Sequence, residues 1–413
     1  MFETLLNDCR ALDLTDEKGF VCGKILAALG VDVIKVEKPG GDPSRGIPPF
    51  YQDVPDPEKS LYWKAFNTDK RSITLNLEKE EGKRLFRKLV EKSDFVIESF
   101  QPGYLDTLEL GYEALRVINP KIIMASITPF GQTGPHSSWK ANEMVVAAMA
   151  GVANNTGEPD RSPVKEALDS TYFHGSAAAA LGVMISYYHC ELTGEGQHVD
   201  VSLQEVTAFR ITSCLNAWQF DKLLLKREGP RQTLGPVATR WFWTCKDGCL
   251  FWHMLGGMQG APANKALSDW IDETETDNPM REITDWQAFD KARMPQEQWD
   301  RMEAKIAPFF MKLKKKEIAQ ESLKRGANAV IIDDPADVLA SEHLAARGYW
   351  ALIEDPALGK ALKYPKYFFL CSEGENYIRR PAPGIGADND EIYGKDLSLS
   401  LPEISSLKSA NVI

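Results

Sequence analysis

The sequence predicts an α/β protein in which a parallel sheet, covered by helices, forms a large domain beside a smaller α+β domain. Three observations lead to this class. Helix and strand patterns alternate through the first half of the chain, the strands are short and almost continuously apolar, and the composition changes at about residue 225. Short apolar strands joined by helices are typical of a parallel sheet that is buried on both faces.

The alternation can be followed element by element. Residues 19–30 predict a helix, because Val21, Ile25 and Leu29 fall on one face and Gly30 follows the last apolar position. Apolar runs predict strands, and charged segments with helical periodicity predict helices. The predicted order continues with a strand at 31–37, a strand at 72–77, a helix at 78–93, strands at 94–100 and 120–127, and a buried alanine-rich helix at 175–191.

The change in composition divides the chain into domains. Residues 1–205 carry the alternating pattern and form the first part of the large domain, and 206–225 form a linker helix. Aromatic strands, a Gly-rich turn and charged helices predict the smaller domain at 226–330. The Pro- and Gly-rich segment 331–413 then returns to the large domain. A chain of 413 residues is long enough for two or three domains.

Bulk composition limits the classes of function. The chain is 43% hydrophobic and 26% charged, as soluble globular proteins are. A net charge of −11 argues against nucleic acids and anionic membranes as general partners. The seven scattered cysteines do not form a disulfide framework. Neither a signal peptide nor a membrane-spanning run is visible, so we expect a protein of the reducing cytoplasm.

Short motifs exclude several kinds of site. The chain has no Walker phosphate loop, no G-x-G-x-x-G after a strand and no G-x-S-x-G elbow. Cys245 and Cys249 lack a second pair at the spacing of a zinc site, so no metal is predicted. Two basic turns, KPGGDPSRG at 38–46 and NTDKRS at 67–72, are either plain loops or loops that contact a phosphate through N–H groups and basic side chains.

Four longer blocks carry more information than the short motifs. They are VIKVEKPGGDPSR, NTDKRSITLNL, the segment from DFVIESF to FGQTGP, and LTGEGQHVDVSLQE, in this order. They resemble blocks of the class III CoA-transferases, the CaiB/BaiF or formyl-CoA transferase-like family, over essentially the whole chain. The resemblance implies a Rossmann-like large domain made from both chain ends, a small domain, and two chains threaded through each other as an interlocked, ring-like dimer.

The resemblance also implies a binding site for coenzyme A, which is a substrate and not a permanently bound cofactor. Basic turns suit the phosphates of CoA, and an apolar slot suits its adenine. A glycine-rich loop of the small domain is expected to cover the active site. The family's CoA-contacting positions map here onto Lys38, Arg45, Asn67, Lys70, Arg71, Ser99, Phe100 and Gln101, and the loop positions onto Gly256, Gly257 and Gly260.

The chemistry that the resemblance implies uses one aspartate. Its carboxylate attacks the acyl-CoA thioester, giving a mixed anhydride and then an enzyme–CoA thioester. Asp169, just before the alanine-rich helix, is the candidate nucleophile. When the run YFHG (172–175) is aligned with the family pattern, Thr171 falls at the catalytic position instead, and Asp169 reaches it only with a shift of two residues. A catalytic chain with Asp169 and a chain without a nucleophile therefore remain open alternatives.

The alternatives imply different partners and reactions. Within the family the chain most resembles the subunits of heteromeric succinyl-CoA:benzylsuccinate CoA-transferases of anaerobic toluene degradation. We therefore expect CoA transfer from an acyl-CoA such as succinyl-CoA to a carboxylic acid such as an aromatic succinate, by this chain with a homologous subunit or with itself. One alternative is a catalytically silent subunit that supports an active partner. Another is an acyl-CoA racemase, which needs a base such as His136 across the pocket from an aspartate.

Overall fold

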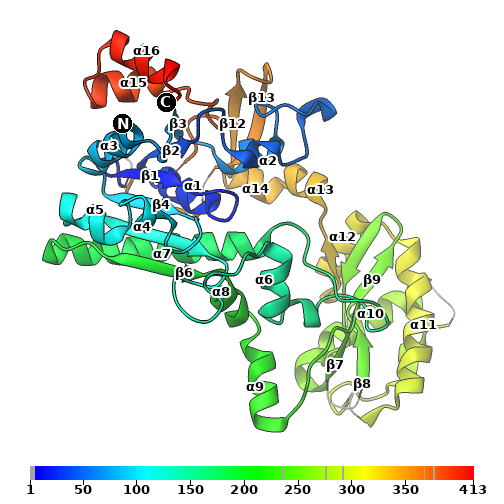
Figure 1. Cartoon of the computed structure of the whole chain (residues 1–413). Helices are drawn as coiled ribbons and strands as arrows, with labels where there is room; N and C mark the ends of the chain where they lie inside the picture. Colours follow the sequence, from blue (N-terminus) through cyan, green and yellow to red (C-terminus); the bar gives the residue numbers. More distant parts are fainter. Residues whose placement is uncertain (1–4, 235–236, 275–276, 291–292, 367, 375–376) are drawn as a thin grey trace. The chain divides into compact units, whose positions relative to one another are not determined.

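The chain is organised as two compact units. The computed structural model describes residues 5–234, 237–274, 277–290, 293–366, 368–374 and 377–413 (Figure 1). Unit 1 consists of Met1–Ala153, Lys165–Leu223 and His343–Ile413, and unit 2 consists of Asn154–Val164 and Leu224–Glu342.

A six-stranded sheet forms the centre of unit 1. It runs in the order β3-β2-β1-β4-β5-β6, and every neighbouring pair is parallel, which confirms the predicted α/β class. The order reverses between β1 and β4, and ligands of doubly wound folds bind beyond the carboxyl ends of the strands at such a reversal. The strands are β1 (Arg10–Leu14), β2 (Asp32–Glu37), β3 (Arg71–Thr74), β4 (Phe95–Glu98), β5 (Ile123–Thr128) and β6 (His198–Ser202).

The central strand β1 is absent from the sequence prediction, because its five residues, RALDL, include the charged Arg10 and Asp13. Asp13 is nevertheless fully buried, and its carboxylate accepts a hydrogen bond from Lys70 Nζ at 2.7 Å. A buried charge is tolerated only when it is paired in this way. The pairing partner lies 57 residues away, so a search for apolar runs does not find the strand.

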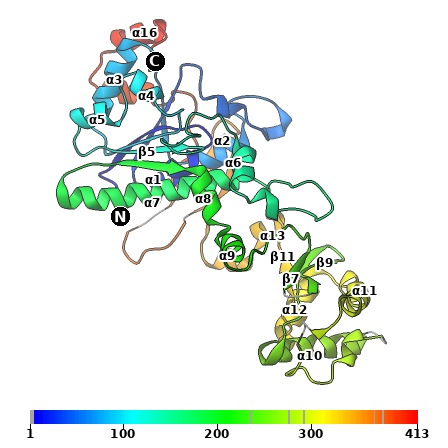
Figure 2. The ribbon, with the colours of Figure 1, turned by 60° about the horizontal axis from the view of Figure 1, so that its bottom comes forward.

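Helices cover both faces of this sheet, as Figure 2 shows for α3, α4 and α5 on one side and for α1 and α7 on the other. Leu85 and Leu115 pack on the first face, and Leu26 and Val183 pack on the second. The helices of the first two segments of unit 1 are α1 (Phe20–Ala28), α2 (Leu61–Phe66), α3 (Glu80–Val90), α4 (Tyr104–Thr107), α5 (Tyr112–Ile118), α6 (Glu143–Met149), α7 (Ser170–Thr193), α8 (Leu203–Phe209) and α9 (Thr212–Asp221).

The alanine-rich helix predicted at 175–191 is longer in the structure, where α7 has 24 residues. It begins directly after Asp169 and ends at Gly194, whose φ of 79° is the left-handed conformation that glycine adopts at helix ends. Close packing fixes its first turns, because a Cβ added to Gly175 would lie 2.1 Å from Leu203 Cδ2 on α8. The position of Asp169 is therefore set by a well-packed helix.

The C-terminal segment completes unit 1. The Thr74 amide donates to Asn389 Oδ1 at 2.9 Å, and the Tyr393 hydroxyl donates to the Thr74 carbonyl at 2.7 Å. The Asn76 amide donates to the carbonyl of Val412 at 2.7 Å. The elements of this segment are α14 (Glu342–Ala346), which begins at the boundary of unit 2, β12 (Trp350–Asp355), β13 (Lys360–Pro365), α15 (Asn389–Glu391) and α16 (Leu401–Ser409).

Unit 2 has its own α+β core, in which Trp243, Trp252, Trp270 and Trp299 are all buried. The strands β9, β10 and β11 form one antiparallel sheet, and β7 pairs with β8. The elements are β7 (Arg231–Leu234), β8 (Val237–Arg240), β9 (Phe242–Cys245), β10 (Gly248–Phe251), α10 (Gly257–Thr274), α11 (Gln296–Lys312), α12 (Lys315–Arg325), β11 (Val330–Ile332) and α13 (Pro335–Ala340).

The unit boundaries differ in detail from the predicted domains. The chain returns to unit 1 at His343 rather than at 331, because β11 is the third strand of the unit 2 sheet and Lys315 forms ion pairs with Asp334 and Asp337. The predicted linker helix at 206–225 is two helices, α8 and α9, within unit 1. Among the helices of the described residues, none has the length and apolar character that a bilayer crossing requires.

Candidate active site

Asp169 occupies the position immediately before the first residue of α7. Its φ of −93° and ψ of 59° are not helical, and within the described part of the chain its side chain makes no capping hydrogen bond to α7. The preceding residue, Leu168, has a left-handed φ of 64°, which turns the chain sharply at the helix start. The Asp169 carboxylate is therefore directed to other partners, and its side chain is 27% exposed.

Two residues from separate parts of unit 1 contact this carboxylate, and a third contacts one of those two. Tyr62, on α2, donates its hydroxyl hydrogen bond to Asp169 Oδ2 at 3.0 Å. Lys165 Nζ lies 3.2 Å from Asp169 Oδ1 and 3.2 Å from Oε2 of Glu143, the first residue of α6. The carboxylate thus receives one hydroxyl and one ammonium, and it keeps contact with solvent.

The surroundings hold Tyr62 and Lys165 in their hydrogen-donating forms. Burial raises the pKa of Tyr62, and the negative charge of Asp169 raises it further. Burial alone would lower the pKa of Lys165, but its hydrogen bonds to Asp169 and Glu143 outweigh that effect and raise the pKa. Asp169 therefore has a neutral and a cationic donor at neutral pH.

Thr171, the other candidate position, lies inside the unit. Thr171 is 1% exposed, and among the described residues its hydroxyl has no hydrogen-bond partner. Ser170 instead donates to Glu166 Oε2 at 2.5 Å, and Glu166 accepts two hydrogen bonds from Arg210 at 2.6 and 2.8 Å. Of the two candidates for the catalytic position, Asp169 is the one with an accessible side chain.

A cavity lies beyond the carboxyl ends of β1, β2, β3 and β4, at the point where the strand order reverses. Its volume is about 240 Å³. Three residues predicted to contact CoA, namely Lys38, Ser99 and Phe100, line it. Lys38 is exposed and lies 3.3 Å from Glu78, and Ser99 donates to Asp16 Oδ1 at 2.8 Å. The rest of the lining combines apolar side chains with four carboxylates, and its members are Leu14, Val36, Pro43, Leu75, Leu77 and Tyr104 together with Asp16, Glu37, Asp42 and Glu78.

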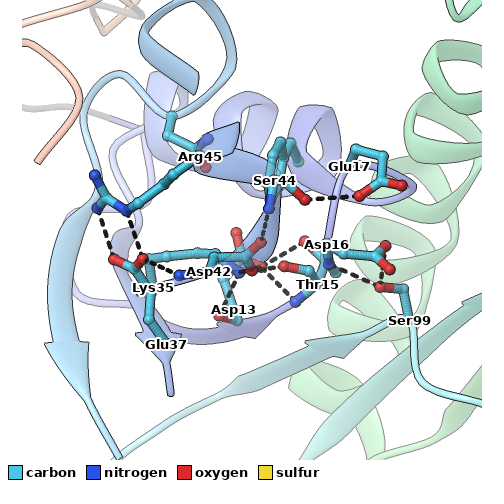
Figure 3. A network of polar contacts seen from close by, with 12 residues as sticks. Asp13, Thr15, Asp16, Glu17, Lys35, Glu37, Asp42, Ser44, Arg45 and Ser99 are labelled. Carbon is cyan, nitrogen blue, oxygen red and sulfur yellow. Dashed lines mark hydrogen bonds and ion pairs between the residues drawn. The ribbon is translucent and has the colours of Figure 1, made fainter. Parts of the chain in front are cut away.

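Another predicted CoA contact, Arg45, belongs to a network of polar contacts at the end of β2 (Figure 3). Arg45 is 1% exposed, forms hydrogen bonds with Glu37 Oε2 and Oε1 at 2.7 and 2.8 Å, and lies 3.8 Å from the ring centroid of Trp63. It holds the turn after β2 in place. Lys35 is also fully buried and lies 3.6 Å from Asp13 Oδ1.

The basic turn at 67–72 is similarly occupied by internal contacts. Lys70 Nζ donates to Asp13 Oδ2 at 2.7 Å and to Asn67 Oδ1 at 2.8 Å. Arg71 donates from Nε to Asp32 Oδ1 at 2.8 Å. The side chains of this turn join β1, β2 and β3, and they are positioned by protein groups alone.

The remaining residues predicted to contact or cover CoA, Gln101 and the three loop glycines, lie outside this cavity. Gln101 is exposed and lines a separate cavity of about 540 Å³ that also contains Glu98 and His198. Gly256, Gly257 and Gly260 belong to unit 2, where Gly257 begins α10 with a left-handed φ of 67°. A Cβ on Gly260 would lie 2.3 Å from the Leu255 carbonyl, so close backbone packing requires this glycine.

Sequence reasoning missed Tyr62, Lys165 and Glu143. Tyr62 lies 107 residues before Asp169 in a short helix that no motif marks. Lys165 could have been found, because it precedes Asp169 by four residues. His136, considered as a base, packs on Trp139 with ring centroids 3.9 Å apart. Within the described ranges, no group of three His, Cys, Asp or Glu side chains is arranged to hold a metal ion.

Comparison with known proteins gives consistent matches over the whole chain. A family profile described as CoA-transferase family III matches residues 6–389. Subunit BbsE of succinyl-CoA:(R)-benzylsuccinate CoA-transferase from Thauera aromatica is 30% identical, over 93% of this chain and 92% of that protein. Succinyl-CoA–D-citramalate CoA-transferase from Chloroflexus aurantiacus is 28% identical, over 99% and 98%. The crystal structure of a CAIB/BAIF family protein from Brucella suis is 26% identical with a TM-score of 0.81, over 96% of this chain and 100% of that one.

Proposed function

This chain belongs to CoA-transferase family III, and we propose that it transfers CoA from an acyl-CoA to a carboxylic acid with Asp169 as the nucleophile. The observation that carries the proposal is the Asp169 carboxylate itself. It lies at the start of α7 without a capping bond, partly exposed, and held by Tyr62 and Lys165. A carboxylate that is fixed in position and still open to solvent can attack a thioester.

The reaction begins with donor acylation of Asp169. One carboxylate oxygen attacks the thioester carbonyl, the carbon–sulfur bond breaks, and the products are a mixed anhydride and the CoA thiolate. The thiolate then attacks the carbonyl carbon of Asp169, which breaks the anhydride and releases the donor acid as its carboxylate. The product is an aspartyl–CoA thioester. An acceptor carboxylate reverses both steps, so atoms and charge balance without a further reagent.

Tyr62 and the N-terminus of α7 stabilise the charge that develops in these steps. When the thiolate attacks Asp169, negative charge forms on an Asp169 oxygen, and the Tyr62 hydroxyl lies 3.0 Å from Oδ2. Donors that are fixed before the reaction stabilise such an oxyanion without reorganisation. The unpaired N–H groups and the dipole of the helix start favour negative charge at the same place.

The cavity beyond β1–β4 is the proposed site for the adenine end of CoA. Its apolar lining of Leu14, Val36 and Phe100 suits a purine ring, and exposed Lys38 suits a phosphate. The buried Arg45 and Lys70 then contribute by fixing the two turns. The donor that we propose is succinyl-CoA, because two of the compared relatives are named for it. The proposed acceptor is a carboxylic acid such as an aromatic succinate.

An apolar stripe along α7 supports an assembly of subunits. Leu181, Ile185, Tyr188 and Leu192 recur at helical spacing, and each is more than 60% exposed. Contiguous exposed apolar side chains of this kind mark protein interfaces. BbsE is itself named as a subunit. We propose that a homologous CoA-transferase chain, or a second copy of this one, covers the stripe in an interlocked dimer.

Trapping the acylated aspartate tests the proposed function. The full chain is incubated with succinyl-CoA, quenched with hydroxylamine and digested, and the peptide containing Asp169 is analysed by mass spectrometry. We expect a hydroxamate on Asp169 and none in the Asp169→Asn variant. An active enzyme in which the Asp169 peptide remains unmodified would contradict the proposal. A chain that forms no adduct and shows no transferase activity on its own would instead favour the catalytically silent role.

A further inference from the structure

The charges around Asp169 are unequal in number. Arg210 and Glu166 neutralise each other through two hydrogen bonds. The remaining cluster contains the carboxylates of Asp169 and Glu143 and a single ammonium, that of Lys165, which lies 3.2 Å from each. Among the described residues Lys165 is the cation that contacts Asp169, and with both acids ionised the cluster has a net charge of −1.

Acylation changes this balance. When CoA is bound as a thioester, Asp169 has no ionised carboxylate, so its negative charge is gone. Glu143 and Lys165 then neutralise each other. When Oδ1 is the oxygen that attacks the donor and leaves with the donor acid, Oδ2 stays with Tyr62 and the ammonium has lost its partner at Oδ1. The side chain of Lys165 is 35% exposed, whereas that of Glu143 is 6% exposed. Lys165 is therefore the more accessible of these two charged groups to an incoming solute.

We propose that Lys165 binds the carboxylate of the acceptor acid at the aspartyl–CoA stage and places it against the Asp169 carbonyl. This inference rests on the proposed function, since it concerns the second half of that reaction. In the resting enzyme the cluster carries a net negative charge, and the Lys165 ammonium is already paired with Asp169. A free carboxylate is therefore repelled. In the thioester form the cluster is neutral and Lys165 has a free donor, so a carboxylate restores the resting charge.

The geometry supports the same order of events. Lys165 Nζ contacts the very carboxyl group that becomes the electrophile. Since Nζ lies 3.2 Å from Asp169 Oδ1, a carboxylate that accepts a hydrogen bond from this ammonium is bound beside the Asp169 carboxyl group. Holding two reacting groups in contact replaces a bimolecular encounter with a local one, which is a large source of rate enhancement.

The test separates the two half-reactions. The purified full chain is loaded with succinyl-CoA, freed of small molecules by rapid gel filtration, and discharged with succinate or with neutral hydroxylamine, and the rate of thioester loss is measured. In Lys165→Met we expect the succinate concentration for half-maximal discharge to rise about ten- to a hundredfold, which is the effect of losing a charge-assisted hydrogen bond. Discharge by hydroxylamine should stay within twofold, and Lys165→Arg should restore most of the succinate response.

Lys395→Met is the matched control. Lys395 is also paired with an acid four residues away, Glu391 at 3.6 Å, but it lies outside the site. The Lys395→Met chain should be discharged by succinate and by hydroxylamine as the unaltered chain is. A Lys165→Met chain that responds normally to succinate would overturn the proposal, and so would one in which succinate and hydroxylamine discharge fall equally.

A second variant decides the matter even if Lys165→Met is unstable or does not load. Glu143→Gln removes one negative charge beside Lys165, so the succinate concentration for half-maximal discharge should fall several-fold. An unchanged or higher concentration would overturn the proposal. If no variant and not even the unaltered chain forms a thioester with succinyl-CoA, the proposed function fails first, which is a different outcome from normal loading with a normal succinate response.

Discussion

Tyr62 and Asp169 are 107 residues apart in sequence, yet the Tyr62 hydroxyl donates to Asp169 Oδ2 at 3.0 Å. The contact joins α2 to the start of α7. Tyr62 is held from its other side by packing of its ring on Phe66, with centroids 4.9 Å apart. The hydroxyl is therefore aimed at the carboxylate by the framework of unit 1.

Tyr62→Phe should slow formation of the aspartyl–CoA thioester by about a hundredfold, because the developing oxyanion loses a fixed donor. Rapid-quench analysis of thioester formation measures the change. The melting temperature should fall little, since the ring remains. Tyr112→Phe, which removes a hydroxyl bonded to the Gly196 carbonyl at 3.0 Å outside the site, is the control and should keep the normal rate. Equal rates in the two variants would exclude Tyr62 as an oxyanion donor.

Asp13→Asn should lower the free energy of unfolding by about 3–5 kcal/mol, because Lys35 and Lys70 would remain buried without their shared acid. Burial opposes ionisation of Asp13, but the two lysines outweigh it and lower its pKa. The stabilisation is therefore present at neutral pH and is lost as the pH falls through that lowered pKa. Urea unfolding at pH 7 measures the effect.

The control for Asp13 is Asp390→Asn, which breaks an exposed ion pair with Lys408 and should change stability by less than about 1 kcal/mol. A small effect of Asp13→Asn, similar to that of the control, would mean that water solvates the two lysines in the folded chain.

Glu98 should make the chain less stable as the pH rises. Burial raises the pKa of this carboxyl to about 7 from its usual 4.5. Between those values the folded chain keeps a proton that the unfolded chain releases, so stability decreases across this window and stays lower above it. The difference corresponds to about 3 kcal/mol, as an order of magnitude.

Glu98→Gln imitates the protonated side chain and should remove this contribution. Urea unfolding of both proteins at pH 5 and pH 8 measures it: the loss of stability between the two values should be smaller in the variant by about 3 kcal/mol. Identical pH dependence of the two proteins would show that Glu98 is solvated and ionised normally.

Charge on the α7 stripe should prevent subunit association. Ile185→Lys places an ammonium in the middle of the four exposed apolar side chains, which a protein interface does not tolerate without a partner for the charge. Analytical ultracentrifugation should show a lower mass than that of the unaltered protein. Leu323→Lys, at an 87% exposed position of α12 in unit 2, should leave the mass unchanged. A fully assembled Ile185→Lys protein would place the interface elsewhere.

The fold was more accessible to sequence reasoning than the site was. Strands β2, β3, β4 and β5 each overlap the segment in which the sequence predicts a strand. Strand β1 does not show such a run, because the Asp13 that interrupts it is compensated by Lys70 from a distant turn. The pattern of apolar residues within one segment contains no information about an ion pair with a distant segment.

The same limit explains the basic residues. Arginine and lysine commonly bind phosphates, but here Arg45 is hydrogen-bonded to Glu37 and Lys70 to Asp13 in the protein interior. Asp169 could be proposed from the sequence because it stands next to a recognisable helix. Tyr62 reaches Asp169, and Glu143 reaches Lys165, only through the packing of α2 and α6 beside α7, and no spacing in the sequence carries that information.

The hydrogen bonds from Thr74 to Asn389 and from Asn76 to Val412 also constrain how the protein is made. During translation, the edge strand β3 cannot form these contacts until residues more than three hundred positions later in the chain have been synthesised. Unit 2 is encoded without interruption from Leu224 to Glu342, apart from one short earlier segment, and can form first. Unit 1 is thus the last part of the nascent chain to be protected, and chaperones have the longest time to act on it.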